Sequence, residues 1–137
     1  MSFSDFLENA LLDHVWGDDS YTAPSPNIYV GLSTTAIQED GTGVTEPADG
    51  YARVEVTNNL TNWPAATTVA NVGTKQNGTE IEFATATGDW GEVVDFFFSD
   101  AATLGNMVAY GNLDVAKTIN EGDTATFEAE SITITLD

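Results

Sequence analysis

With 137 residues, no cysteine and 22 acidic side chains against 3 lysines and arginines, the chain carries a formal net charge of −19. A surface of this sign repels phosphate, which argues against nucleic acid and against an anionic membrane as partners. The lack of cysteine excludes disulfides, thiolate catalysis and zinc–thiolate sites.

The first 17 residues predict an amphipathic helix. Ser2 or Ser4 can act as its N-cap, it runs to about Trp16, and Gly17 ends it. Its apolar residues recur at spacings of three and four, so they form one stripe. We expect the stripe to lie either across the open end of the β-rich remainder or against a neighbouring subunit. It consists of Phe3, Phe6, Leu7, Ala10, Leu11 and Val15.

The chain up to residue 56 predicts two strands separated by a long loop. Two prolines make residues 17–27 turn-like, and residues 27–33 form the first strand. Residues 34–50 are polar and rich in glycine, with little to bury, and loops of this length are typically contact segments or mobile. Apolar–polar alternation then predicts a second strand at residues 51–56.

The region before residue 80 predicts a weak strand and a hairpin. Residues 60–73 combine an irregular crossing with a weak strand near residues 67–72. Asn77 and Gly78 are a two-residue hairpin signal, which predicts that the chain turns back on itself at this point.

We expect the hydrophobic core to form around residues 80–100. It opens with alternation, which places Ile81 and Phe83 on the dry face of a strand. The β-branched and aromatic run at residues 93–98 predicts a central strand with both faces partly covered. Between the two lies a core turn with its aromatic residue packed inward, made of Gly88, Asp89, Trp90 and Gly91.

The last third of the chain predicts further short strands. Regular turns between short strands favour a β-sandwich or jelly roll. The predicted fold class is therefore mainly β, an antiparallel β-sandwich or jelly-roll-like fold with one N-terminal α-helix. We expect one structural domain, with the helix at residues 1–17 and the sandwich at residues 18–137. The further strands are expected at residues 107–112, 113–118, 124–128 and 131–137.

No catalytic or metal-binding motif stands out. His14 is the only histidine, and no serine stands in a nucleophile-elbow context. The carboxylates are so numerous that chance pairs carry no indication of a glycosidase. Asp18, Asp19 and Asp40 offer oxygens for calcium, but their spacing does not match a calcium-binding loop. We therefore expect no enzyme, no cofactor and no metal.

Short motifs spread along nearly the whole chain belong together. They are S-D-F-L-E-N-A-L-L-D-H at residues 4–14, I-Y-V-G-L-S at 28–33, G-Y-A-R-V at 50–54, F-A-T-A-T-G-D-W-G at 83–91, F-F-S-D-A-A-T at 97–103, K-T-I-N-E-G-D-T at 117–124 and I-T-I-T-L-D at 132–137. With these motifs the chain resembles a family of small tailed-bacteriophage virion proteins, commonly labelled tail fibre proteins. It departs from the family at residues 60–78 and in the aromatic pair Phe97 and Phe98.

The resemblance implies a non-enzymatic structural protein of the virion, made in the host cytoplasm. Since the chain shows neither a repeat nor a shaft, a capsid decoration or cement protein is favoured over a tail or tail-fibre component. A carbohydrate-binding module that uses exposed tryptophans and a calcium site is a second alternative. The expected partners are the major capsid protein or tail proteins, together with further copies of this chain. No signal peptide or transmembrane segment is visible.

Contacts in the particle are expected at apolar side chains that the monomer leaves uncovered. Anchoring in a core or an interface is a commoner role for tryptophan than stacking on sugars. The acidity has three open explanations, namely a basic partner surface, a saline habitat or a solubilising shell. The interaction candidates are Phe3, Phe6, Leu7, Leu11, Val15, Trp16 and Trp63.

Overall fold

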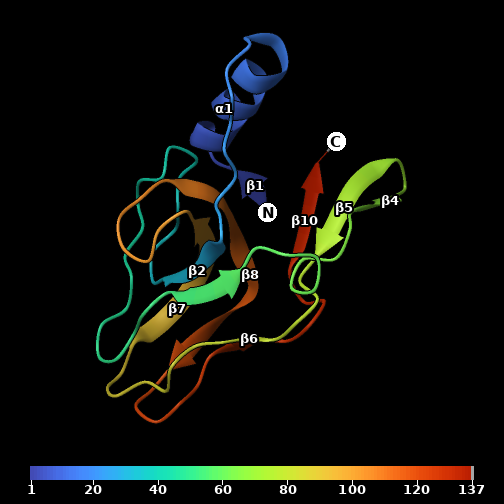
Figure 1. Ribbon diagram of the computed structural model, residues 1–137. Helices are drawn as coiled ribbons and strands as arrows, with labels where there is room; N and C mark the ends of the chain where they lie inside the picture. Colours follow the sequence, from blue (N-terminus) through green and yellow to red (C-terminus); the bar gives the residue numbers. More distant parts are fainter. Residues whose placement is uncertain (137) are drawn as a thin grey trace.

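The fold is mainly β and antiparallel, with one helix at the N-terminal end, as the sequence predicts (Figure 1). The structure, a computed structural model, describes residues 1–136. Within these residues the strands form one sheet of five strands, one of three and one of two. Asp137, the end of the last predicted strand, lies outside the described residues.

The five-stranded sheet is built around the strand predicted to be central. Its order is β1 (Ser2–Phe3), β8 (Met107–Ile119), β7 (Gly91–Ser99), β2 (Asn27–Ser33) and β3 (Val54–Thr57). In β7 the three consecutive phenylalanines are all buried, so both faces of this strand are covered. The sequence-based expectation for residues 93–98 is therefore confirmed.

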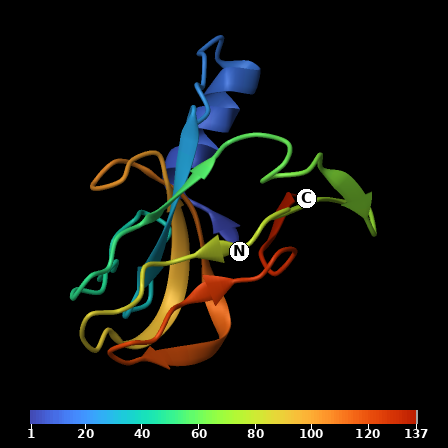
Figure 2. The same ribbon diagram turned by 60° about the horizontal axis from the view of Figure 1, so that its bottom comes forward.

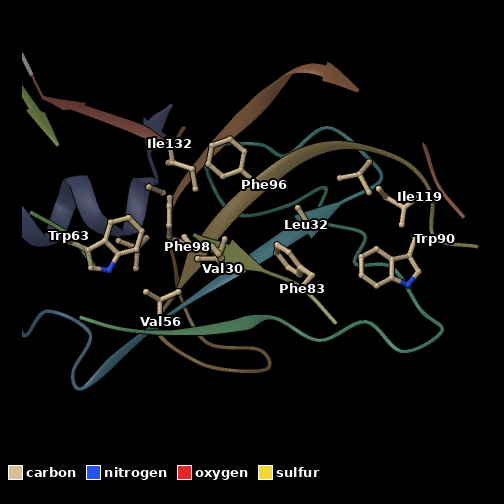
Figure 3. Close-up of a cluster of buried hydrophobic side chains, with 14 of the residues drawn as sticks. Val30, Leu32, Val56, Trp63, Phe83, Trp90, Phe96, Phe98, Ile119 and Ile132 are labelled. Atoms are coloured by element: carbon tan, nitrogen blue, oxygen red, sulfur yellow. The ribbon is translucent and has the colours of Figure 1, made fainter. Parts of the chain in front are cut away.

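Two smaller sheets lie over one face of the large sheet. They are β10 (Thr133–Leu136) with β5 (Val72–Gln76) and β4 (Thr67–Val69), and β6 (Ile81–Glu82) with β9 (Thr126–Phe127). Phe96 of β7 contacts Phe127 of β9, with ring centroids 5.2 Å apart, so the core lies between the layers (Figures 2 and 3). The labelled core side chains are Val30, Leu32, Val56, Trp63, Phe83, Trp90, Phe96, Phe98, Ile119 and Ile132.

The loop at residues 34–50 covers the opposite face of the large sheet instead of standing free. Ile37 is buried at 5% exposure, although the sequence suggested that this loop has little to bury. Its backbone N–H donates to Asp95 Oδ2 at 2.7 Å, and the Asn112 amide donates to Asp95 Oδ1 at the same distance. The carboxylate of Asp95, 1% exposed, therefore ties the loop to β7 and β8.

The ring of Phe97 on this second face explains a glycine in β2. Gly31 pairs with Phe97, and a Cβ added at Gly31 would lie 2.3 Å from the Phe97 Cζ atom. The Arg53 guanidinium lies over the same ring, with Cζ 4.9 Å from the ring centroid. Only glycine leaves room for the aromatic ring here, which fixes the side chain beneath the cation.

Three predicted elements differ from the structure. The strands expected at residues 107–112 and 113–118 are one strand, β8, which pairs with β7 on both sides of an irregularity in the register. The prediction of a hairpin at Asn77-Gly78 is wrong. The flanking strands β5 and β6 do not pair with each other, because β5 pairs with β4 and β10 while β6 pairs with β9. The strand expected at residues 51–56 begins only at Val54.

Asn77 is buried because it binds a distant segment of backbone. Its Nδ2 donates to the carbonyls of Thr79 and Glu128, at 2.9 and 2.8 Å. Its Oδ1 accepts from the Ile132 N–H at 2.8 Å. At 1% exposure, this amide holds the approach to β10 against the end of β5. The polar residue that reads as a turn signal is thus a buried connector between remote segments.

Replacing Asn77 by alanine is expected to cost about 2–3 kcal/mol of unfolding free energy, because it leaves buried backbone groups without partners. Chemical denaturation of both proteins measures the difference. Asn9→Ala, an exposed asparagine in the helix, is the matched control and should change stability by less than about 0.5 kcal/mol. An equal loss in the two variants would contradict the connector role of Asn77.

Candidate functional site

The described residues contain no built metal site. Among residues 1–136, no three side chains of histidine, cysteine, aspartate or glutamate lie together so that they could hold a metal ion. Asp40 Oδ1 accepts from the N–H and the hydroxyl of Thr42, at 2.9 and 2.7 Å. The hydroxyl bond, followed by the backbone bond, lowers the Asp40 pKa. This carboxylate therefore caps its own turn.

Asp18, Asp19 and His14 also belong to a local turn. Asp19 Oδ1 accepts from the Ser20 N–H at 2.8 Å, and His14 Nδ1 lies 3.0 Å from the Asp19 carbonyl oxygen. Asp18 adopts a left-handed backbone conformation, with φ of 58°. All of these residues are exposed, and they close the turn that follows the helix.

The tryptophans divide into two buried residues and one exposed residue. Trp63, named from the sequence as an interaction candidate, is only 4% exposed and packs edge-on against Phe98, with centroids 5.5 Å apart. Trp90 is 5% exposed and lies at the opposite end of the core cluster from Trp63 (Figure 3). Trp16 is 79% exposed. Sugar stacking on Trp63 or Trp90 would therefore require the core to open.

The turn predicted at residues 88–91 connects β6 to β7 and is held from several sides. Trp90 Nε1 donates to the Asp49 carbonyl at 3.1 Å, and Asp89 Oδ1 accepts from the Glu121 N–H at 2.9 Å. A Cβ added at Gly88 would lie 2.9 Å from the Asp49 Cβ, and Gly91 has φ of +81°. Trp90 is buried in the core, whereas Asp89 of the same turn is exposed.

The helix α1 (Asp5–Trp16) begins and ends where the sequence predicts. Ser4 Oγ accepts from the Leu7 N–H at 3.3 Å as the N-cap, and Gly17 follows the last turn. Ser4 is 2% exposed, and its hydroxyl also bonds to the Val108 carbonyl of β8 at 3.1 Å. A buried cap therefore fixes the base of α1 to the large sheet. From there the helix extends away from the sheets in both ribbon views (Figures 1 and 2).

The predicted apolar stripe of α1 is split by this arrangement. Phe3 lies outside the helix, in β1, where it pairs with Ala109 of β8. Leu7 is buried, and Leu11 packs partly against the core. Phe6 is 40% exposed and meets Tyr21 edge-on at 6.5 Å. Ala10 is half-buried, and Val15 is 58% exposed. Trp16, an interaction candidate that follows the stripe, is 79% exposed.

A third exposed residue joins Val15 and Trp16. Leu12 is 56% exposed and was missed in the sequence because it lies beside the predicted stripe. Its spacing of three and four residues from the other two could have revealed it, since residues at these spacings share one helix face. We call Leu12, Val15 and Trp16 the apolar tip.

The apolar tip lies among acidic residues. Asp13, Asp18 and Asp19 are exposed close to it in the sequence, and His14 is exposed as well. Because Leu12, Val15 and Trp16 gather at the far end of a helix whose base is fixed, the tip is presented as a rigid projection. An exposed apolar cluster with a charged rim is typical of protein–protein contacts.

No helix within the described residues 1–136 has the length and apolar character to cross a membrane. A search of curated proteins finds no match to the chain. A family described as "Podophage GP4 fiber I protein gp80" (Gp80) matches residues 2–135. Because this match covers nearly the whole sequence, the chain belongs to the Gp80 family of podophage fibre proteins and is a phage structural protein.

Proposed function

We propose that the chain is a structural component of the tail-fibre apparatus of a podophage-like virus. The observation that carries this proposal is the family match along residues 2–135. It supports the tail-fibre alternative better than capsid decoration, which the sequence alone favoured. We further propose that the chain makes its attachment without catalysis and without a cofactor, through contacts with other virion proteins.

The apolar tip is the proposed attachment surface. Burial of a large apolar side chain contributes roughly 1.5–3 kcal/mol, so three such residues can supply most of the binding free energy of a small contact. The tip stands on a helix that is already capped and fixed at its base. Little conformational entropy is therefore lost on binding, which favours affinity.

The division of the chain into a helix at residues 1–17 and a β body at residues 18–137 stays a prediction. β1 pairs with β8, with Ser2 opposite Tyr110, so the first residues also complete the edge of the large sheet. In the proposed arrangement the β body and β1 form the stable platform, and the rest of α1 is the arm that reaches the partner.

Cryo-electron microscopy of the parent particle tests the location. The proposal expects density that fits this chain at the tail, and antibodies against the chain should label tails after they are separated from capsids. Copies distributed over the faces of the shell would overturn it in favour of capsid decoration.

Replacing Leu12, Val15 and Trp16 together by serine is expected to reduce incorporation into particles that lack the protein by at least about tenfold, because the buried apolar area is lost. The melting temperature of the isolated chain should shift by less than about 3 °C, since all three side chains are exposed.

The matched control is the triple variant Leu60→Ser, Val69→Ser and Leu104→Ser, which removes apolar side chains that are also more than half exposed but are not part of α1. This control should incorporate normally. Full incorporation of the tip variant, or an equal loss in the control, would refute the tip as the attachment surface.

A further inference from the structure

The helix face that carries the apolar tip continues toward the base of α1 with two acidic residues. Asp5 and Glu8 lie in the first turn of the helix, and both are exposed. Glu8 precedes Leu12 by four residues, and Asp5 precedes Leu12 by seven. These spacings correspond to one and two helical turns, so the acids and the tip share one face. This face is therefore acidic near the sheet and apolar at its far end.

The monomer does not cover the acidic part of this face. The side of α1 that packs on the sheet is that of Leu7, which is buried, and of Leu11, which packs partly against the core. Within residues 1–136, the side chains of Asp5 and Glu8 form neither an ion pair nor a hydrogen bond. Their charges favour the N-terminal end of the helix dipole, a contribution to the helix that leaves both carboxylates open to a partner.

This region also lacks a cation of its own. Arg53 is the first lysine or arginine of the chain, and it pairs with Glu46. His14 lies on α1, but its Nδ1 is 3.0 Å from the carbonyl oxygen of Asp19, in the turn that follows the helix. No lysine or arginine therefore lies on α1 or in the following turn. Any cation that balances the two acids must come from a binding partner.

We propose that the apolar tip docks into a basic groove of another virion protein. The groove has an apolar pocket for the tip, followed by arginine or lysine side chains that face Glu8 and Asp5. With a rise of 1.5 Å per residue, these cations lie about 6 Å and about 10 Å from the level of Leu12 toward the helix base. The inference rests on the proposed attachment through the tip, and it adds the chemistry of the receiving surface.

Charge complementarity is the reason for a basic groove. Docking of the tip brings Asp5 and Glu8 to the rim of the contact, where their carboxylates lose part of their hydration. A carboxylate that loses water without gaining a cation or a donor opposes binding. Arginine suits this position, because its guanidinium donates two parallel hydrogen bonds to a carboxylate. An anionic membrane would repel the acids, and the same face of a second copy offers no cation.

The salt dependence of attachment tests this complementarity. Incorporation of the unaltered chain into particles that lack it should fall at least about tenfold between about 0.05 and about 0.5 M sodium chloride, since salt screens the attraction of exposed opposite charges. Incorporation that stays constant or increases with salt would overturn the proposal. Those responses are expected of a purely apolar contact and of a contact between like charges.

Neutral variants test the position of the charges. Asp5→Asn combined with Glu8→Gln should reduce incorporation at low salt by about tenfold or more, because two attractive pairs are lost. The matched control, Glu80→Gln combined with Glu92→Gln, removes the same charge from two exposed residues outside α1. It should incorporate within about threefold of the unaltered chain, since only the overall charge changes. Equal incorporation of the two double variants would overturn the proposal.

The same salt series separates recognition from helix stability. If the neutral variant of Asp5 and Glu8 loses only charge pairs, it should approach the unaltered chain at about 0.5 M salt, where those pairs are screened. A frayed helix would instead lower incorporation by a similar factor at every salt concentration. That second pattern would overturn the basic groove.

The tip variant distinguishes failure of this inference from failure of the proposed attachment. Loss of incorporation on replacing Leu12, Val15 and Trp16 by serine, with no effect of salt or of neutralising Asp5 and Glu8, would leave the tip as the attachment surface and exclude a basic partner. Full incorporation of the tip variant would refute the attachment itself, and the basic groove with it.

Discussion

Replacing Trp90 by alanine is expected to cost about 3–5 kcal/mol of unfolding free energy, the usual range for deleting a large aromatic side chain from a core. Trp90 is 5% exposed and packs edge-on against Tyr51, with centroids 5.4 Å apart. Its indole N–H donates to the Asp49 carbonyl, and its backbone N–H donates to the Ile119 carbonyl at 2.9 Å. The substitution removes both the ring and the side-chain hydrogen bond that ties the neighbouring loop to the turn.

Urea unfolding followed by circular dichroism measures this loss. Trp90→Phe keeps most of the packing and removes the indole donor, so it should cost less, about 1–2 kcal/mol. Trp16→Ala serves as the control, because Trp16 is exposed and its loss should change stability by less than about 0.5 kcal/mol. A loss below about 1 kcal/mol for Trp90→Ala would mean that the turn does not need its aromatic residue.

Replacing Arg53 by methionine is also expected to cost about 2–3 kcal/mol, because it leaves the carboxylate of Glu46, 29% exposed, without its cation. The Arg53 side chain is 8% exposed. Its Nε donates to Glu46 Oε1 at 2.9 Å, and its Nη2 donates to Glu46 Oε2 at 2.8 Å. Its Nη1 donates to the carbonyls of Ala101 and Leu104, at 2.9 and 2.8 Å. One guanidinium thus joins the loop at residues 34–50 to the turn between β7 and β8.

The phenol of Tyr51 completes this cluster. Its hydroxyl donates to Glu46 Oε1 at 2.9 Å and accepts from the Leu32 N–H at 2.8 Å. Burial raises the Tyr51 pKa, so the phenol keeps its proton and its role as a donor at neutral pH. Glu46 therefore has hydrogen-bond donors from two side chains, and the loss of Arg53 leaves it with one.

Thermal and urea unfolding of two variants distinguish a stranded charge from lost packing. Adding Glu46→Gln to Arg53→Met should restore part of the stability, because the uncompensated carboxylate is then removed. Arg53→Lys should remain destabilised, since an ammonium group cannot reproduce the bidentate contact with the carboxylate. If the double variant is less stable than Arg53→Met alone, the destabilisation comes from packing and the charge explanation fails.

Local sequence signals account for the elements that were predicted well. Ser4 and Gly17 define α1 because capping depends on a few adjacent residues. Alternation of Ile81 and Phe83 with two glutamates predicted which side of β6 and its extension is dry, and both apolar side chains are 2% exposed. These features can be read from sequence because the physical cause lies within a few residues of the effect.

Features that depend on remote contacts could not be predicted in the same way. Asn77 has the composition of a turn, but its amide binds the carbonyl of Glu128, which is 51 positions later. Arg53 reads as one strand residue among others, and its partners at Ala101 and Leu104 are brought near by the fold. The stripe is divided for a related reason, because Phe3 lies in β1 and the helix base buries only Leu7 and part of Leu11.

The pairing of early strands with late ones has a consequence for how this protein is made. β1 pairs with β8, β5 with β10 and β6 with β9. Each sheet is therefore complete only when a strand from the last third of the described chain is present. A nascent chain still on the ribosome therefore cannot close its core until synthesis is nearly finished. Non-local pairing of this kind also slows folding, because the ends of long segments must meet first. Early termination of translation at residue 125 would remove β9 and β10, which leaves β6 without its partner and β5 with β4 alone, and the fragment would be a substrate for proteases.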